Sequence, residues 1–173
     1  MFKNFDISPF KKAKPPSDHS FDTAQEIKNL KKTPLRKDLA KKYDNIELAF
    51  KKTAEENNIK DYDEKIASNL IKKSAPIILK LKNHHNRPRP YELDKNLSAF
   101  KMKSMNTPSY PSGHSAQGYL IGSVLKKKYG KGSAFMKTAK NISDSRISAH
   151  AHYPSDSKFG VELGNKLSKE VKS

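Results

Sequence analysis

The chain of 173 residues is 34% apolar and 31% charged, and it carries a formal net charge of +17. This length predicts a single domain with an economical core. No apolar run approaches the roughly 20 residues that a membrane-spanning helix needs. The absence of cysteine excludes disulfides, thiolate metal ligands and a cysteine nucleophile.

The first residues, MFKNFDISPFKKAKPP, lack the apolar centre of a secretory signal. Because neither a signal peptide nor a transmembrane segment is recognised, we expect a soluble, cytoplasmic protein. Three prolines among the lysines of residues 1–20 predict an extended basic arm, and one helical domain is expected over residues 21–173.

Apolar residues near helical spacing predict three helices in the first half of the chain. Pro76 lies inside the third, which is therefore either kinked or two helices in succession. Asp61 or Asp63 is placed to cap its start. The expected ranges are 21–32, 34–57 and 61–84.

A loop of uncertain structure is expected over residues 91–107, followed by helices over 112–128 and 133–151. Pro154 cannot continue the second of these, and Ser155 is placed to cap a last helix. In that helix, small residues at four-residue spacing allow a neighbouring backbone to approach closely; they are Gly160, Gly164 and Ser168. Since strand patterns are almost missing, the predicted fold class is all-α, a compact single-domain helical bundle.

A net charge of +17 attracts phosphates, nucleic acids or anionic membrane surfaces. The lysines are scattered along the whole chain, so the charge is also consistent with a lysine-rich composition that has no binding role. Arginine offers a planar fork that grips phosphate with two donors. It occurs at only four positions, three of them beside histidines and prolines: Arg36, Arg87, Arg89 and Arg146. This contrast favours a specific anion site.

Three segments carry residues suited to such a site. In the first, KNHHNRPRP over residues 82–90, Lys82 closes a predicted helix and Arg89 lies in a loop that prolines hold rigid. From this segment alone, a basic helix end that complements its own dipole is an equally good interpretation.

The second segment, SYPSGHS over residues 109–115, opens a predicted helix at a glycine-containing turn, where backbone N–H groups bind anions. His114 in that first turn is placed to donate a proton to a departing oxygen. A capping serine followed by an incidental histidine is the alternative.

The third segment, SRISAHAHYPSD over residues 145–156, combines an anion clamp, an imidazole and a carboxylate in Arg146, His152 and Asp156. Across the turn at Pro154, Asp156 is placed to fold back onto His152. The alternative is a plain ion pair between Arg146 and Asp156 beside a buried histidine.

The order and spacing of the three segments resemble the phosphatidic acid phosphatase type 2 superfamily. This superfamily includes bacterial class A acid phosphatases and vanadium-dependent haloperoxidases. The matching pattern is Lys, six residues, Arg-Pro; then Pro-Ser-Gly-His; then Ser-Arg, five residues, His, three residues, Asp, between Lys82 and Asp156. The resemblance implies a helical bundle of the acid phosphatase and vanadium haloperoxidase type.

The resemblance also implies a role for each matching residue. His152 would be the nucleophile that takes the phosphoryl group, with Asp156 holding its other ring nitrogen. His114 would be the general acid that protonates the leaving oxygen. The residues implied to bind phosphate are Lys82, Arg89, Ser112, Gly113 and Arg146.

Some residues depart from the family pattern or lie outside it. His150 stands where relatives usually have a glycine or another small residue, and it is expected to line the pocket or to pack, with tuning of His152 as a further alternative. Arg87 is a second candidate for pocket lining. His84 and His85 lack the carboxylate-rich partners of a metal site, so no metal is expected.

The implied function is a metal-independent phosphatase that hydrolyses phosphate monoesters or pyrophosphates through a phosphohistidine. The substrate is expected to be a small phosphorylated molecule, with a lipid phosphate as the less favoured alternative. Two further alternatives are a haloperoxidase, the only one that requires vanadate as a cofactor, and a basic protein that binds nucleic acid or another anion on the same fold. No oligomeric state is predicted.

Overall fold

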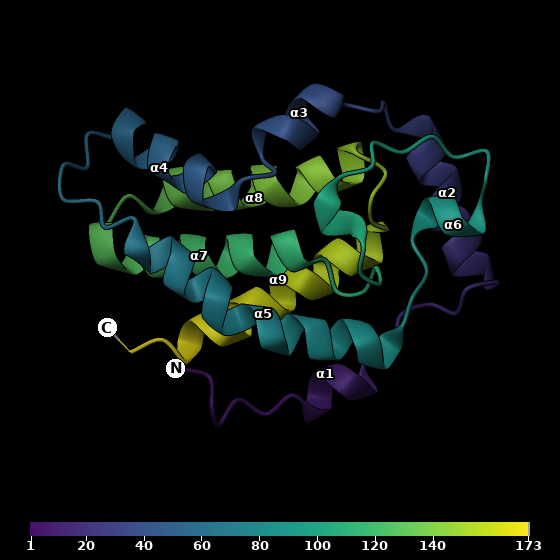
Figure 1. The fold of residues 1–173 in the computed structure, drawn as a ribbon, viewed down its shortest axis with the longest axis horizontal. Coiled ribbons are helices and arrows are strands. Elements are labelled where there is room, and N and C mark those ends of the chain that lie inside the picture. The colour runs from purple at the N-terminus through teal and green to yellow at the C-terminus, as the bar shows by residue number, and fades with distance from the viewer. Residues whose placement is uncertain (173) are drawn as a thin grey trace.

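The computed structural model describes residues 1–172, and over them it contains helices and no strand, which confirms the all-α class (Figure 1). The longer helices form the body of the bundle: α2 (Phe21–Lys32), α4 (Ile46–Glu56), α5 (Lys65–His85), α7 (Gly113–Tyr129), α8 (Gly132–Ser148) and α9 (Pro154–Lys169). The shorter ones are α1 (Ser8–Lys12), α3 (Lys37–Lys42), α6 (Pro90–Leu93) and the 3-10 turn η1 (Lys103–Met105).

Helix α7 is the centre of the bundle and packs against both α8 and α9. Its Leu120, Ile121 and Leu125 are fully buried in the main core. Small residues bring α9 close: a Cβ on Gly164 would collide with the carbonyl oxygen of Ala116, and one on Gly160 with that of Ser112. The close approach expected from the glycine row is therefore observed.

Helix α5 continues through Pro76, so the alternative of two successive helices is wrong. Pro76 is exposed, and the carbonyl that its missing N–H would have bonded belongs to Lys72, which is also exposed. Water can therefore replace that hydrogen bond, while Leu70, Ile78 and Leu81 keep the opposite face of the helix in the core.

The predicted helix over residues 34–57 is interrupted, and this prediction is corrected. Helix α3 ends at Lys42, and Asn45 begins α4 by accepting a hydrogen bond from the Leu48 N–H at 2.9 Å. A side-chain cap competes with helix continuation, because asparagine binds the backbone best where the chain is not helical. The break places Asp44 in a turn.

The last helix begins two residues earlier than a cap at Ser155 would place it, and Ser155 does not cap it. Pro154 is its first residue, and the Asp156 carboxylate accepts the Tyr153 N–H at 3.0 Å. Ser155 instead donates its N–H and its hydroxyl to Glu26 of α2, at 2.6 and 2.8 Å.

The N-terminal segment lies along the bundle and contains α1. His85 on α5 contacts the Phe10 carbonyl oxygen through Nε2 at 2.9 Å, and the Tyr110 hydroxyl donates to the Ala13 carbonyl at 3.0 Å. The division into an arm over 1–20 and a domain over 21–173 stays a prediction, and its last residue, Ser173, lies outside the described residues.

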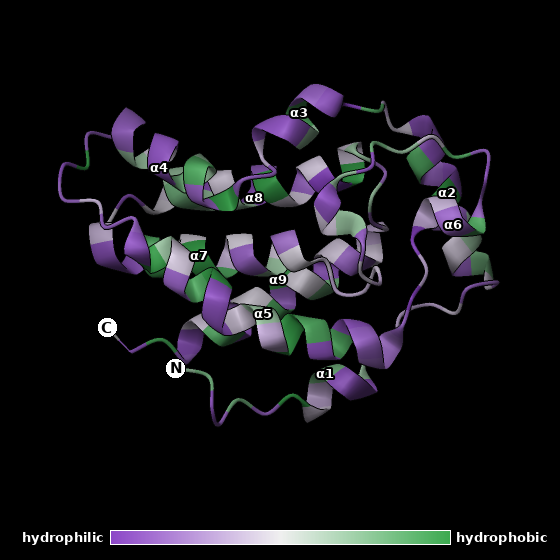
Figure 2. Ribbon diagram, in the orientation of Figure 1, coloured by the Kyte–Doolittle hydropathy of each residue, from purple (hydrophilic) through white to green (hydrophobic). Residues whose placement is uncertain are grey.

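None of the helices within residues 1–172 has both the length and the apolar character needed to span a bilayer. Figure 2 shows hydrophilic residues interspersed with hydrophobic ones along the long helices.

Candidate active site

The three segments singled out from the sequence meet at one end of the bundle. The end of α5, the start of α7, the end of α8 and the start of α9 come together there, on the right in Figure 1. Arg89 lies 3.2 Å from His152, and the Ser112 N–H donates to the Asp156 carbonyl at 3.0 Å. Arg89 and His152, which are 63 positions apart in the chain, therefore share one polar cluster.

His152 and Asp156 form a buried pair at the base of this cluster. Asp156 Oδ2 lies 3.1 Å from His152 Nδ1, so Nδ1 carries the proton and Nε2 is left with its lone pair. Burial lowers the pKa of His152 to about 3, because the ring is removed from water, and this outweighs the opposing hydrogen bond to Asp156. The imidazole is therefore neutral, the state that a nucleophile requires.

The Asp156 carboxylate has four polar partners. Oδ2 also accepts from the Ser109 hydroxyl and the Tyr153 N–H, and Oδ1 accepts from Arg87 at 2.7 Å. Burial by itself raises the pKa of Asp156, but the hydrogen bond to His152 and the charge of Arg87 outweigh burial, and the pKa is lowered. Asp156 is thus an ionised, fixed orienting group.

Lys82 and Arg89 are buried cations beside His152. Lys82 Nζ donates to the Pro108 carbonyl at 2.5 Å, and Arg89 donates to the carbonyls of Thr107 and Ala151 at 3.0 and 2.9 Å. Burial, reinforced by the nearby charge of Arg89, lowers the pKa of Lys82 to about 7. Burial likewise lowers the pKa of Arg89. Two buried cations whose hydrogen bonds go to neutral carbonyl oxygens favour binding of an anion.

Asp44 links the third buried cation to His114. Its Oδ1 lies 3.1 Å from Arg146 Nη1 and 3.4 Å from His114 Nε2, and its carbonyl oxygen lies 2.9 Å from the same His114 nitrogen. Arg146 also donates to the Ala40 carbonyl at 2.8 Å. The hydrogen bond from His114, followed by the charge of Arg146, lowers the pKa of Asp44 against the opposing effect of burial. His114 Nε2 is therefore directed at the Asp44 turn, and Nδ1 is the ring nitrogen that takes no part in these contacts.

Asp44 is the site residue that the sequence prediction missed. It was placed inside a continuous helix, where its carboxylate would have been one solvated charge among many. The signal was the Asp-Asn pair at residues 44 and 45, because asparagine is a preferred helix cap.

Ser112 and Gly113 form the start of α7 as expected. The Ser112 hydroxyl caps the helix by accepting the Ser115 N–H at 3.3 Å, and it also accepts from the Ser115 hydroxyl at 2.9 Å. A Cβ on Gly113 would meet Ile78 at 3.5 Å, an ordinary contact, so space inside the protein does not by itself require glycine here.

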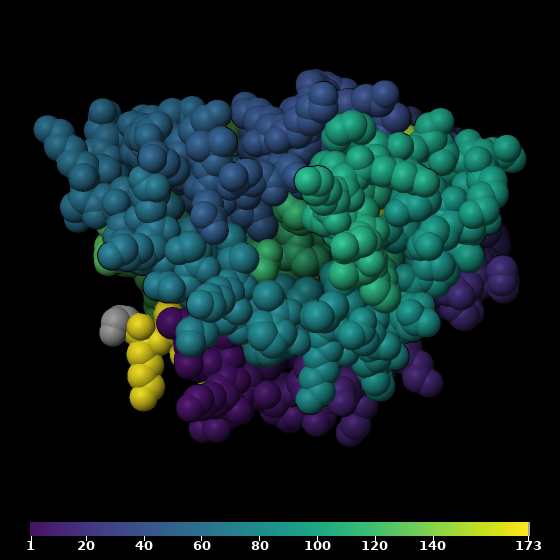
Figure 3. All heavy atoms as spheres, viewed as in Figure 1, coloured from purple at the N-terminus to yellow at the C-terminus, as the bar shows by residue number. Residues whose placement is uncertain are grey.

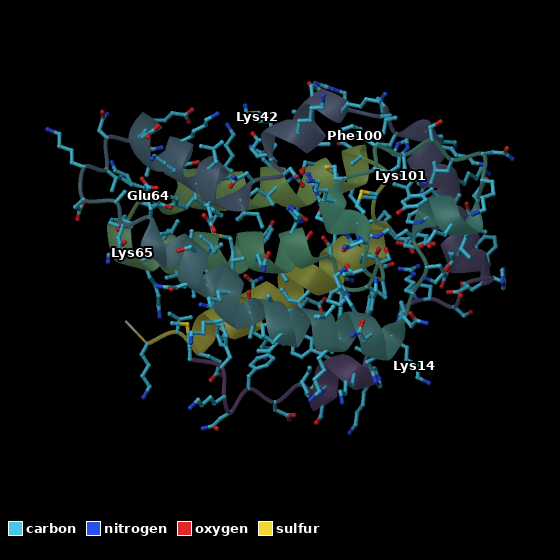
Figure 4. All side chains as sticks on the ribbon, in the orientation of Figure 1. Lys14, Lys42, Glu64, Lys65, Phe100 and Lys101 are labelled. Atoms are coloured by element: carbon cyan, nitrogen blue, oxygen red, sulfur yellow. The ribbon has the colours of Figure 1, made fainter. Side chains whose placement is uncertain are left out.

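A cavity of about 420 Å³ lies beside His114 and reaches to α4 and α5. Its lining is mostly polar or charged: Asp44, Asn45, Ile46, Glu47, Ile71, His114 and Gln117. Figure 3 shows a hollow in this face, bordered by the α3–α4 region, the loop before α7 and α5. In that loop, Phe100 and Lys101, labelled in Figure 4, are held by cation–π contacts with Lys41 of α3 and with Tyr91.

A model of the PAP2 superfamily matches residues 66–168, which include every candidate residue from Lys82 to Asp156. The chain belongs to the PAP2 superfamily. No individual curated protein sequence matches it. Membership supports a phosphoester hydrolase in general terms. The matched range leaves out Asp44 and the first four helices, α1 to α4.

His150 has a left-handed backbone with φ of 54°. Glycine adopts this conformation freely, and histidine is among the non-glycine residues that tolerate it best. The buried ring faces two carbonyl oxygens, with Nδ1 2.7 Å from that of Ser98 and Nε2 2.8 Å from that of Thr33. The ring therefore joins two loops; of the roles expected for it, packing fits these contacts best.

Arg87 was expected to line the pocket, but its contacts are with other protein groups. It is 2% exposed, its guanidinium stacks 3.7 Å from the centre of the Tyr153 ring, and it donates to Asp156 Oδ1 and to Glu26. Its Nη1 and Nη2 donors are thus directed at protein acceptors, and Nη1 binds the Asp156 oxygen that His152 does not contact. Arg87 supports Asp156 and ties it to α2.

The remaining histidines of the first segment face the N-terminal segment. His84 and His85 contact the carbonyl oxygens of Lys11 and Phe10. Within residues 1–172 no group of three histidine, cysteine or acidic side chains is arranged to hold a metal ion.

Proposed function

We propose that this PAP2-superfamily protein is a phosphatase that hydrolyses phosphate monoesters or pyrophosphates through a phosphohistidine at His152, without a metal. The observation that supports this most is the buried, neutral His152, whose Nδ1 faces Asp156 while Nε2 lies among buried cations. A neutral imidazole with one nitrogen fixed by a carboxylate presents the other as a nucleophile.

In the first step, the Nε2 lone pair attacks phosphorus and the bond from phosphorus to the leaving oxygen breaks. His114 gives a proton from Nδ1 to that oxygen, so the alcohol leaves neutral. Lys82, Arg89 and Arg146 balance the negative charge on the phosphoryl oxygens in the transition state. The phosphorylated ring keeps its Nδ1 proton and is cationic, and the ionised Asp156 stabilises it.

In the second step, water attacks phosphorus as neutral His114 accepts its proton. The bond between Nε2 and phosphorus breaks, inorganic phosphate is released, and His152 returns to its neutral form. Both steps use the same residues, with His114 acting first as acid and then as base.

The polar lining of the cavity beside His114 supports a small, polar leaving group over a diacylglycerol. The leaving oxygen must lie next to His114, so its substituent would enter this cavity. Asn45, Glu47 and Gln117 offer hydrogen bonds there that an acyl chain cannot use.

The test is turnover of an aryl phosphate by the protein and by two histidine variants. His152→Ala is expected to lower kcat at least about 1000-fold, because the covalent step is lost. His84→Ala, a histidine outside the cluster, should keep wild-type activity. Undiminished turnover by folded His152→Ala would refute the proposal, and a parallel series of sugar, nucleotide and lipid phosphates would rank the substrate classes.

A further inference from the structure

A second concave surface lies at the opposite end of the bundle from the candidate active site. α5 begins beside this groove and ends at the polar cluster, whereas α7 begins at the cluster and ends beside the groove. The 17 residues of α7 separate the two sites by about 25 Å. The groove is therefore no part of the phosphate site.

The walls of the groove are apolar. Ile66 and Leu70 of α5, Val124 of α7, and Met1 and Val171 line it. Leu70 belongs to the main core and is 2% exposed, so the floor of the groove is the core itself. Its volume of about 520 Å³ lies in the range of ligand sites, about 300–1,000 Å³.

The charged residues that line the groove are all cationic. They are Lys127 and Lys128 at the end of α7 and Lys172, and the remaining polar residue is the uncharged Asn69. Within residues 1–172, no acidic side chain is among the lining residues. An apolar trough bordered by ammonium groups complements a molecule with an alkyl chain and an anionic head.

The residues around the groove favour binding of one enclosed molecule over attachment of the protein to a membrane surface. Within residues 1–172, the large apolar side chains that are exposed are Met1, Phe21, Leu48 and Leu79. They belong to four separate segments of the chain, and Met1 alone lines the groove. No apolar surface extends outward from the groove that would insert into a bilayer.

We propose that the groove binds a single long-chain carboxylate. Its alkyl chain lies along Ile66, Leu70 and Val124, and its carboxylate pairs with Lys127 and Lys128. This site is independent of the proposed phosphatase activity, because it shares no residue with the cluster around His152.

The test measures binding of monomeric dodecanoate, below its micellar concentration, by calorimetry. We expect one site per chain with a dissociation constant in the micromolar range. The double variant Lys127→Gln/Lys128→Gln and the single variant Val124→Ser should each weaken binding at least about tenfold. The matched control, Lys137→Gln/Lys158→Gln, removes the same charge from exposed positions on α8 and α9 and should bind as the unmodified protein does.

Three results would overturn the proposal: equal loss of affinity in both lysine double variants, equal affinity for dodecyltrimethylammonium, which has the opposite charge, or binding only to anionic vesicles. Amide chemical shifts locate the site independently of any variant. Changes at residues 66–70 and 124–128 support it, and changes confined to residues 112–114 assign the anion to the phosphate site instead. Aryl phosphate turnover, measured in the same samples, reports separately on the proposed phosphatase.

Discussion

At the scale of single residues, the chemistry depends on cations that are buried before a substrate arrives. Lys82 is the one whose charge changes near neutral pH, because burial and the charge of Arg89 lower its pKa to about 7. An incoming phosphate would favour the protonated amine. Binding of phosphate and of a proton to Lys82 are therefore coupled.

This coupling predicts the pH dependence of inhibition by inorganic phosphate. Above pH 7 the free protein loses the Lys82 charge, so the inhibition constant should rise, by up to about tenfold per pH unit. Lys82→Arg keeps its charge throughout and should lack this step. Phosphate itself titrates identically in both experiments, so the difference between the two profiles isolates Lys82. If the inhibition constants of the unmodified protein and of Lys82→Arg changed with pH in the same way, Lys82 would not be the group that titrates.

The left-handed backbone of His150 gives a prediction about stability. His150→Gly loses two side-chain contacts but relieves the strain of a Cβ at a φ of 54°. His150→Ala loses the same contacts and keeps that strain of about 1–2 kcal/mol. Alanine should therefore give the less stable protein by about that amount in urea unfolding. Equal stabilities of the two variants would show that the strain is absent.

At the scale of elements, the site exists because four helix ends are packed at fixed distances. Helices α7 and α9 approach each other closely, and their first turns carry His114 and Asp156, respectively. Gly164 allows this approach because a Cβ there would strike the Ala116 carbonyl.

Substitution at this contact should separate α7 from α9. Gly164→Ala is expected to cost at least about 1–3 kcal/mol of unfolding free energy, because a backbone group cannot move aside as a side chain can. Gly118→Ala on α7 is the matched control, since its Cβ would make ordinary contacts of 3.4–3.6 Å with α8 and gain helix propensity. Thermal or urea unfolding distinguishes them, and equal effects would contradict the packing argument.

Much of this arrangement follows from local sequence. Helices α2, α5, α7 and α8 lie close to their predicted ranges because apolar spacing, glycine and capping serine act locally. The break before Asn45 has a local signal that was missed, but the role of Asp44 is tertiary, because the turn brings its carboxylate to Arg146, 102 positions away. Ser155 failed as a cap for a similar reason, since Glu26 of a distant helix engages both its polar groups.

The residues of the candidate site likewise include some that the sequence could identify and others that it could not. The residues from Lys82 to Asp156 were identifiable because the family pattern fixes their types and spacing. Arg87 occupies a position that the pattern leaves unspecified, so its support of Asp156 was not identifiable. His150 contacts Ser98 and Thr33, which lie outside the three segments. Residue type alone could not distinguish an arginine that binds substrate from one that holds a carboxylate.

At the scale of the whole molecule, the net charge of +17 should assist capture of anionic substrates. Raising the salt concentration from about 10 mM to about 0.5 M screens this attraction over most of its range. We expect kcat/KM for an aryl phosphate to fall several-fold while kcat changes little. A salt-independent kcat/KM, or a fall in kcat alone, would show that the charge has no part in capture.

The most direct test of the central proposal is to locate the phosphoryl group during turnover. The protein is mixed with an aryl phosphate, quenched in alkali to preserve a bond between nitrogen and phosphorus, digested and analysed by mass spectrometry. We expect the phosphoryl group on His152, and no such peptide from His152→Ala. Phosphoryl transfer to another residue, or rapid turnover with no phosphorylated peptide at any quench time, would contradict a phosphohistidine at His152.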